Sequence, residues 1–221
     1  MLPSVRAGSE DRIRQTSLLM QQIRRLEAEE DAVADEILKI QKGMLFVSLY
    51  ASIEFTITSA VSEFLAVLQA TPVSATSYQT ALLTVILNSE FNSISDGGNK
   101  RRWTSKAELI DAIFSKSPRV IDSGIFPAEG TNISVDHLNS IWRHLKLPGD
   151  SLPMGVNPWV IGEIKDHRNA IAHGRERAAV IGSGITIADL ESKCSSIEAI
   201  CTHIVMSFEE HIRNKSYLLT V

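Results

Sequence analysis

The sequence predicts an all-α fold, a helical bundle with long helices near both ends of the chain and an inserted loop region between them. Apolar residues recur every three or four positions in long segments near both ends, which is the spacing of one helix face. A third segment is apolar at nearly every position, as in a helix buried on all sides. Only 12 glycines and 7 prolines occur among 221 residues, so few positions interrupt a helix.

The length of 221 residues fits one domain. We expect a single domain over residues 1–221, with its core at residues 20–213 and a flexible segment at residues 1–9. The apolar share of 44% is typical of a soluble globular chain and excludes a disordered or collagen-like one.

Two predicted helices fill the first third of the chain. The first is an amphipathic helix over residues 13–40, and Gly43 marks a predicted break before a buried helix over residues 44–68. On that second helix, Glu54 and Glu63 need partners or a function, because burying an unpaired charge is costly.

Short helices and loops are predicted for the middle of the chain, punctuated by glycine, proline and capping residues. They are a short helix at 77–87, a turn or loop at 88–103, a helix begun by the capping box at 105–108, an ordered loop at 117–134 that could hold a small hairpin, a helix at 136–145 capped by Ser134, and a linker around Pro148 and Pro153.

Two helices close the chain. Asn157 and Pro158 predict the start of the first, and Gly174 stands where a glycine ends a helix. Its apolar face consists of Val160, Ile164, His167 and Ile171. The final long helix opens at residues 186–189 and carries Cys194 and Cys201, which we expect to be reduced because their separation along the helix axis exceeds a disulfide's reach.

Charge and hydropathy exclude several classes of protein. Lys and Arg total 22 against 26 Asp and Glu, a net charge of −4, which argues against a dedicated duplex-DNA binder. No apolar run approaches the length of a membrane span, and residues 1–14 lack the apolar core of a signal peptide. We therefore expect a cytoplasmic protein without a membrane partner.

The residues most suggestive of chemistry lie at the end of the helix that begins near Asn157. Arg168 is followed by Asn169 and, five positions after the arginine, by His173. A neutral histidine can accept the proton of a ribose 2′-hydroxyl or return one to a leaving 5′-oxygen. An arginine stays charged and can bind two phosphoryl oxygens, stabilising the charge of a pentacoordinate transition state. The pair therefore suits metal-free cleavage of RNA.

This motif resembles that of the HEPN superfamily, whose helical bundles carry an Arg and a His with four to six residues between them, near the start of a late helix or at the end of one. The likeness extends to the stand-alone bacterial, RiboL-PSP-like branch and covers residues 20–210. It is carried by residues 42–54 with the pattern Leu49-Tyr50-small-small-apolar-Glu54, by Phe126-Pro127, by Ile141-Trp142 and by Arg168-Asn169.

The resemblance implies a homodimeric endoribonuclease that needs no cofactor and acts in a toxin–antitoxin or phage-defence context. Arg168 and His173 would be catalytic, RNA the substrate, and a cognate antitoxin or defence-system protein a further partner. The tyrosine that some toxin branches carry two residues after the motif histidine is replaced here by Arg175.

Helix geometry supports a homodimer independently. Residues five apart on an ideal helix lie about 140° around its axis, so one copy does not direct Arg168 and His173 at one atom. Two copies could line a shared cleft. Asn169 would support the Arg168 rotamer, and Glu54 could pair with Arg168. Glu63, on the opposite side of its helix from Glu54, is not expected at that site.

Several cations are candidates for contacts with RNA. Arg175 and Arg177 directly follow His173, and the run Lys100-Arg101-Arg102 precedes Trp103, which could stack a base. No Cys or His cluster has the spacing of a metal site, so none is expected.

Three alternatives remain open from the sequence. Arg168 could belong to a buried salt bridge and His173 could be a helix-terminal histidine favoured by the helix dipole. The chain could also be a catalytically inactive HEPN-like module that binds RNA or protein. Finally, it could be a helical oligomerisation or regulatory protein in which the motif is a coincidence.

Overall fold

The computed structural model describes residues 2–29, 31–98, 100–121 and 132–219, and the elements in these ranges are helices, as predicted. In the described ranges, Tyr78 and Leu218 also pair through an isolated antiparallel β-bridge. The elements are α1 (Pro3–Glu27), α2 (Ala32–Ala70), two 3-10 turns (Ala75–Ser77 and Thr80–Leu82), α3 (Leu83–Ile86), α4 (Asn88–Asp96), α5 (Arg102–Phe114), α6 (Val135–Leu145), α7 (Trp159–Ala172), α8 (Ala178–Ser183) and α9 (Ile187–Arg213).

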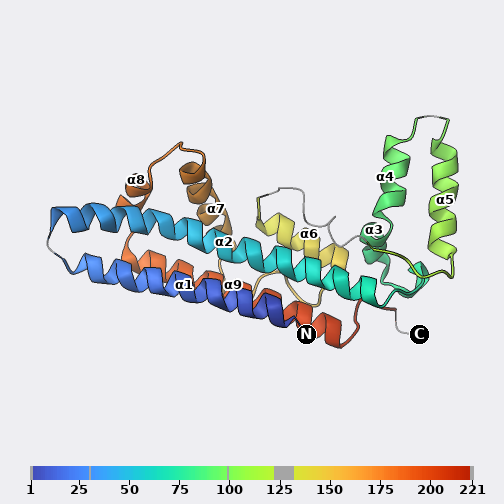
Figure 1. Cartoon of the computed structure of the whole chain (residues 1–221), viewed down its shortest axis with the longest axis horizontal. Coiled ribbons are helices and arrows are strands. Elements are labelled where there is room, and N and C mark those ends of the chain that lie inside the picture. Colours follow the sequence, from blue (N-terminus) through green and yellow to red (C-terminus); the bar gives the residue numbers. More distant parts are fainter. Residues whose placement is uncertain (1, 30, 99, 122–131, 220–221) are drawn as a thin grey trace.

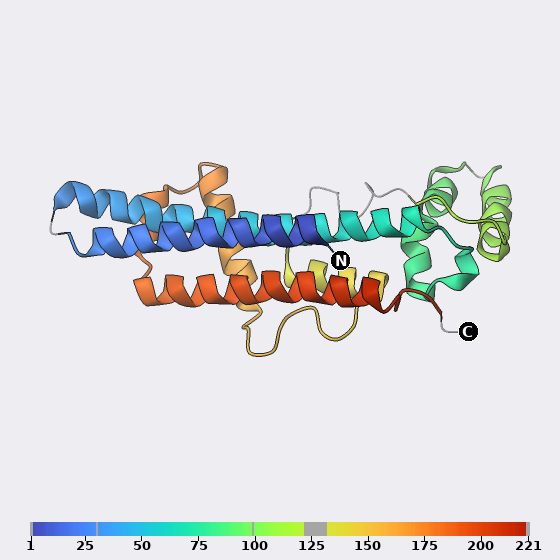
Figure 2. The same cartoon turned by 60° about the horizontal axis from the view of Figure 1, so that its bottom comes forward.

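Three long helices form the body of the molecule. Helices α1, α2 and α9 run side by side along its longest axis, α7 and α8 lie against one half of α2, and α6 lies against the other half (Figures 1 and 2). Helix α2 forms the centre, with Phe46, Leu49, Ile53 and Phe64 at most 1% exposed. It is long and apolar enough to span a membrane, but 56% of its most apolar window is buried, as in the core helix of a soluble protein.

The first helix boundary differs from the prediction. The break lies before Ala32, where the carboxylate of Asp31 accepts hydrogen bonds from the backbone N–H groups of Val33 and Ala34. Gly43, the predicted break, lies inside α2 instead. A Cβ atom there would overlap the backbone carbonyl of Ala178, so this glycine lets α8 pack directly on α2.

The expected flexible segment at residues 1–9 is also corrected. Helix α1 starts at Pro3, and Leu2 and Val5 are each 1% exposed. The backbone N–H of Leu2 donates to Glu209 on α9 over 3.2 Å. The chain is therefore anchored from residue 2 onward, because its apolar side chains extend the core.

The predicted loop at 88–103 contains a helix, α4, and the start of α5 instead. Helices α4 and α5 pack antiparallel and project from the end of the bundle (Figure 1). Helix α5 begins at Arg102, directly after the glycine turn, and the hydroxyl of Ser105 makes no cap, so the predicted capping box at 105–108 is wrong. Of the predicted loop at 117–134, residues 122–131, including Phe126-Pro127, lie outside the described part.

Several predicted helix ends are confirmed. The hydroxyl groups of Ser134 and Thr186 accept hydrogen bonds from the third residue of α6 and α9, respectively. Asn157 accepts a 3.1 Å bond from the backbone N–H of Trp159 at the start of α7. Cys194 and Cys201 are free thiols, as expected.

Candidate active site

Helix α7 ends in a motif that fixes the position of His173. Gly174, with a φ of 65°, donates its N–H to the carbonyl of Ile171, and the N–H of Arg175 reaches back to Ala170 over 2.9 Å. These two bonds form a Schellman motif, which needs a left-handed residue such as glycine directly after the cap. The cap residue is His173, so its side chain leaves the helix at its very end.

Arg168, one turn earlier, is held by four neighbours. Its Nη1 donates to the amide oxygen of Asn169 over 2.8 Å and to that of Asn132 over 3.4 Å. Its Nη2 lies 3.6 Å from a carboxylate oxygen of Glu54, and its guanidinium carbon lies 4.3 Å from the centre of the Tyr50 ring. The Arg168 side chain is 26% exposed, so the cation is fixed yet reachable from solvent.

The predicted supporting residues Asn169 and Glu54 therefore both contact Arg168. Asn169 is 8% exposed, and its side chain bonds the arginine directly. The Glu54 side chain is 41% exposed, which makes its pair with Arg168 partly screened by water. Glu63, expected elsewhere, indeed lies beside Ser4 of α1, over 3.4 Å.

Tyr50 and Asn132 are residues of this site that the sequence analysis did not assign. The Tyr50 hydroxyl accepts a 2.8 Å hydrogen bond from the backbone N–H of Ile133, which ties the segment after the inserted loop to α2. Burial raises the pKa of Tyr50, so its hydroxyl stays neutral. Tyr50 precedes Glu54 by four residues and shares its helix face, a signal that could have identified it. Asn132 carried no such signal.

His173 has a different environment from Arg168. It is exposed, and its imidazole makes no hydrogen bond or ion pair to any residue within the described ranges. Arg175 and Arg177 are exposed beside it. Arg175 also borders a surface hollow that Asp166, His167, Glu176 and Val180 help to line. This places cations next to the motif histidine.

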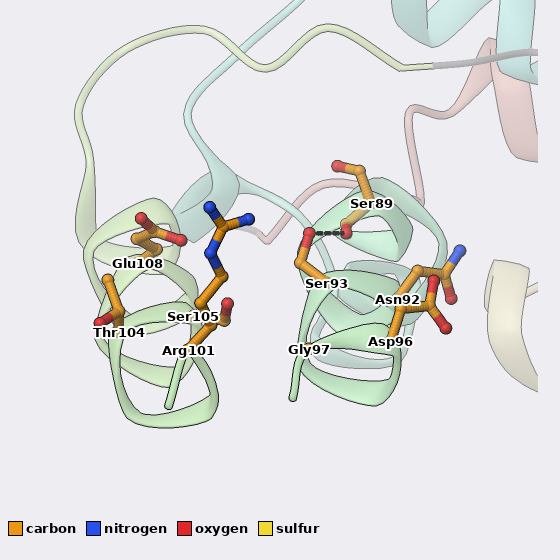
Figure 3. Close-up of a pocket in the computed structure, with 9 residues that line it drawn as sticks. All are labelled: Ser89, Asn92, Ser93, Asp96, Gly97, Arg101, Thr104, Ser105 and Glu108. Atoms are coloured by element: carbon orange, nitrogen blue, oxygen red, sulfur yellow. Dashed lines mark hydrogen bonds between the residues drawn. The ribbon is translucent and has the colours of Figure 1, made fainter. Parts of the chain in front are cut away.

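Lys100, Arg101 and Arg102 lie far from this site, at the tip of the α4–α5 hairpin (Figure 1). Arg101 points into a polar cleft between the two helices, opposite Ser93, with Glu108 on the same side as the arginine (Figure 3). The acidic side chains of Asp96 and Glu108 also line this cleft. A contribution of the three cations to RNA binding stays a prediction, and the structure does not bring them together with Arg168.

The chemistry available at the α7 site is that of a fixed cation beside a histidine. Over residues 2–29, 31–98, 100–121 and 132–219, no group of three His, Cys, Asp or Glu side chains is arranged to hold a metal ion. The guanidinium can bind an anionic group, and the exposed imidazole can exchange protons.

Comparison with known proteins identifies a family. The model of the RiboL-PSP-HEPN family matches residues 9–210, which include every contact of Arg168 described above. No curated protein and no solved structure matches the chain.

Proposed function

Because the chain belongs to the RiboL-PSP-HEPN family, we propose that it is an endoribonuclease that cleaves RNA without a metal ion. The observation that carries this proposal is the fixed guanidinium of Arg168, clamped by Asn169, Asn132 and Glu54 and stacked on Tyr50. A preorganised cation of this kind stabilises the charge that develops on a phosphoryl group. His173, five residues later, supplies the proton transfer.

The proposed reaction is a transesterification within the RNA. The ribose 2′-oxygen attacks the adjacent phosphorus while a neutral His173 accepts the hydroxyl proton. The bond from phosphorus to the 5′-oxygen breaks, and the leaving oxygen takes a proton from a second, protonated histidine. The products are a 2′,3′-cyclic phosphate and a 5′-hydroxyl. Arg168 stabilises the negative charge of the pentacoordinate transition state that precedes them.

The second histidine comes from a second copy of the chain. On one helix, side chains five residues apart diverge by about 140°, and Arg168 is directed at α2 whereas His173 caps the helix end. The adjacent face of α2 is suited to such a contact. It exposes an apolar stripe whose residues are spaced by four, three and four positions. The stripe consists of Val33, Ile37, Ile40 and Met44, which are 66%, 40%, 42% and 42% exposed. We propose that the homodimer buries this stripe.

The proposal places the protein in the cytoplasm, where its RNA substrate is, in a toxin–antitoxin or phage-defence context. Restraint by a cognate antitoxin or defence-system partner belongs to that context. Arg175 and Arg177 would hold RNA phosphates beside His173.

A module that binds RNA or protein without cleaving is the second candidate. It is favoured by the absence, within the described ranges, of a polar neighbour that orients the His173 ring. Catalytic histidines are usually oriented by such a group.

End-group analysis distinguishes the two candidates. Purified protein is incubated with total RNA and with tRNA in EDTA, beside Arg168→Ala, His173→Ala and the control Arg143→Ala on the exposed side of α6. We expect 2′,3′-cyclic phosphate ends with wild type and Arg143→Ala and none with the two site variants. Equal inertness of all four proteins, together with retained RNA binding, would instead establish the non-cleaving module.

The dimer is tested separately. At low protein concentration, Ile40→Glu should give a monomer in sedimentation and lose cleavage although Arg168 and His173 are intact. The matched control is Leu18→Glu on α1, where the native side chain is 51% exposed but does not belong to the α2 stripe.

A further inference from the structure

Helix α5 exposes three of its large apolar side chains, while Leu109 and Ile113 are partly buried against the core. Trp103, Ile110 and Phe114 are 76%, 52% and 71% exposed, whereas Ser105 and Ala112 are 8% and 9% exposed. A surface helix normally carries charged or polar residues on the face that points away from the core. The sequence analysis attached Trp103 to a cationic run and did not anticipate this face.

The exposed side chains follow a heptad pattern. Trp103, Ala107, Ile110 and Phe114, hereafter the α5 stripe, are spaced by four, three and four residues, as are the d and a positions of a coiled coil. In this register the buried residues Ser105 and Ala112 take the f positions, on the far side of the helix from the stripe. Helix α5 lies at the outer end of the molecule, with α4 on its inner side (Figures 1 and 2). The stripe therefore faces outward.

The charges beside the stripe indicate what covers it. Lys106 takes the g position and Asp111 the e position, and neither forms an ion pair with any residue in the described part of the chain. Lys106 rests on the Trp103 ring, 4.5 Å from its centre. When two such helices pack in parallel around a two-fold axis, the g flank of each faces the e flank of the other. Lys106 of each copy then lies beside Asp111 of the other copy, which gives two ion pairs.

We propose that the α5 stripe is a self-association surface on which α5 of a second copy packs in parallel, held by two Lys106–Asp111 ion pairs. An antiparallel pair would place the two Asp111 flanks against each other, which disfavours it. The acidic residues Glu108 and Asp111 along the same helix disfavour an RNA backbone as the occupant. The surface is independent of the proposed nuclease activity.

The size of the stripe sets the strength of the association. A fully buried aromatic side chain removes about 150–250 Å² from water, so two aromatics and an isoleucine bury a few hundred Å² per copy. A standard stable interface buries about 800 Å² per partner. The contact is therefore weak and concentration-dependent. Combined with the proposed α2 contact, it would extend dimers into longer assemblies.

Sedimentation of the full chain over a range of concentrations tests the surface, both in the wild-type chain and in an Ile40→Glu background that removes the α2 contact. Ile110→Glu should raise the dissociation constant of self-association at least tenfold. Met206→Glu, at a 58% exposed apolar position on α9, is the matched control and should leave it unchanged. No difference between Ile110→Glu and Met206→Glu would overturn the proposal.

A charge-reversal cycle tests the parallel register. Lys106→Glu and Asp111→Lys should each weaken the association, because each creates two like-charge contacts, and the double variant should restore it. Failure of the double variant to restore association would rule out this pairing.

Cross-linking gives a third measurement. Ala107→Cys should form a disulfide-linked dimer under mild oxidation, whereas Glu108→Cys, off the stripe, should not. The native Cys201 is buried and Cys194 half-buried, and both variants retain them. If Trp103→Ala lowers RNA affinity while the sedimentation of every variant matches wild type, the stripe binds RNA and the proposal is wrong.

Discussion

The two ends of the bundle differ in how many hydrogen-bond and ion-pair partners their polar side chains have. At the α7–α8 end, Arg168 is clamped by two amides and a carboxylate, and the nearly buried Lys42 donates to the carbonyl of Ile185 over 3.2 Å. At the other end, His211 is fully buried, and neither of its ring nitrogens makes a hydrogen bond of good geometry in the described part of the chain. That end also exposes the α5 stripe.

The held Arg168 cation is suited to chemistry, whereas the α5 stripe is suited to packing. A charge that several neighbours hold in one place can act on a substrate without reorganising, which is the condition for electrostatic catalysis. An apolar stripe with unpaired flanking charges can recognise a second helix but has no group poised for a reaction. We therefore propose a chemical role for the α7–α8 end, together with the dimer contact on α2, and a role in self-association alone for the hairpin end.

The most severe test of this division is Arg168→Lys. Lysine keeps the charge but cannot bind two phosphoryl oxygens or stack on Tyr50 as a planar group. We expect kcat for RNA cleavage to fall by about 10²–10³-fold, the cost of removing one preorganised donor. Thermal unfolding should change little, because the side chain is partly exposed. Arg143→Lys on α6 is the control, and a kcat for Arg168→Lys within threefold of wild type would contradict the assignment.

The packing of the same end can be broken by one methyl group. Gly43→Ala should destabilise the fold by about 1–3 kcal/mol or more, because its Cβ would overlap the carbonyl of Ala178 and separate α8 from α2. Gly162→Ala in α7 is the matched control. Its Cβ meets nothing within 4 Å, so it should stabilise the chain by up to about 1 kcal/mol through helix propensity. Denaturant unfolding measures both, and equal stabilities would show that α8 packs elsewhere.

Gly43 also shows why the sequence predicts some elements and not others. A glycine usually indicates a helix break, but Gly43 lies within α2. The reason is the close approach of α8, which the local sequence does not show. Helix α4 was missed for the same reason: its polar sequence resembles a loop, and its packing on α5 makes it a helix.

The site itself was more predictable than its surroundings. Asn169 is adjacent to Arg168, and Glu54 had to be paired because it lies on an apolar helix, so both could be assigned locally. Asn132 reaches Arg168 from 36 residues away along the chain. No periodicity encodes such a contact.

The buried histidine at the hairpin end makes stability depend on pH. Burial lowers the pKa of His211 from 6.5 to about 4, so below pH 6.5 the unfolded chain binds a proton that the folded chain does not. Stability is therefore fully retained above pH 6.5 and falls as the pH drops toward 4. We expect a loss of about 2 kcal/mol between pH 7 and pH 5 from this group.

His211→Phe separates this contribution from the others. The ring lies between Phe64 and Tyr217, with centroids 5.3 and 5.8 Å away, so phenylalanine fits the cluster without a titratable group. Denaturant unfolding at pH 7 and pH 5 should show a smaller loss for His211→Phe than for wild type. An unchanged loss would mean that other groups cause it.

The smallest expected effect concerns Tyr50, which contacts both Arg168 and the backbone of Ile133. Tyr50→Phe keeps the ring under the guanidinium but leaves the Ile133 N–H without its acceptor, which should cost about 1–2 kcal/mol of stability and change kcat little. Tyr50→Leu removes the ring as well and should lower kcat further. A positioning role predicts that kcat separates the two variants while KM does not. If both variants lower kcat only in proportion to unfolded protein, Tyr50 supports the fold and not the site.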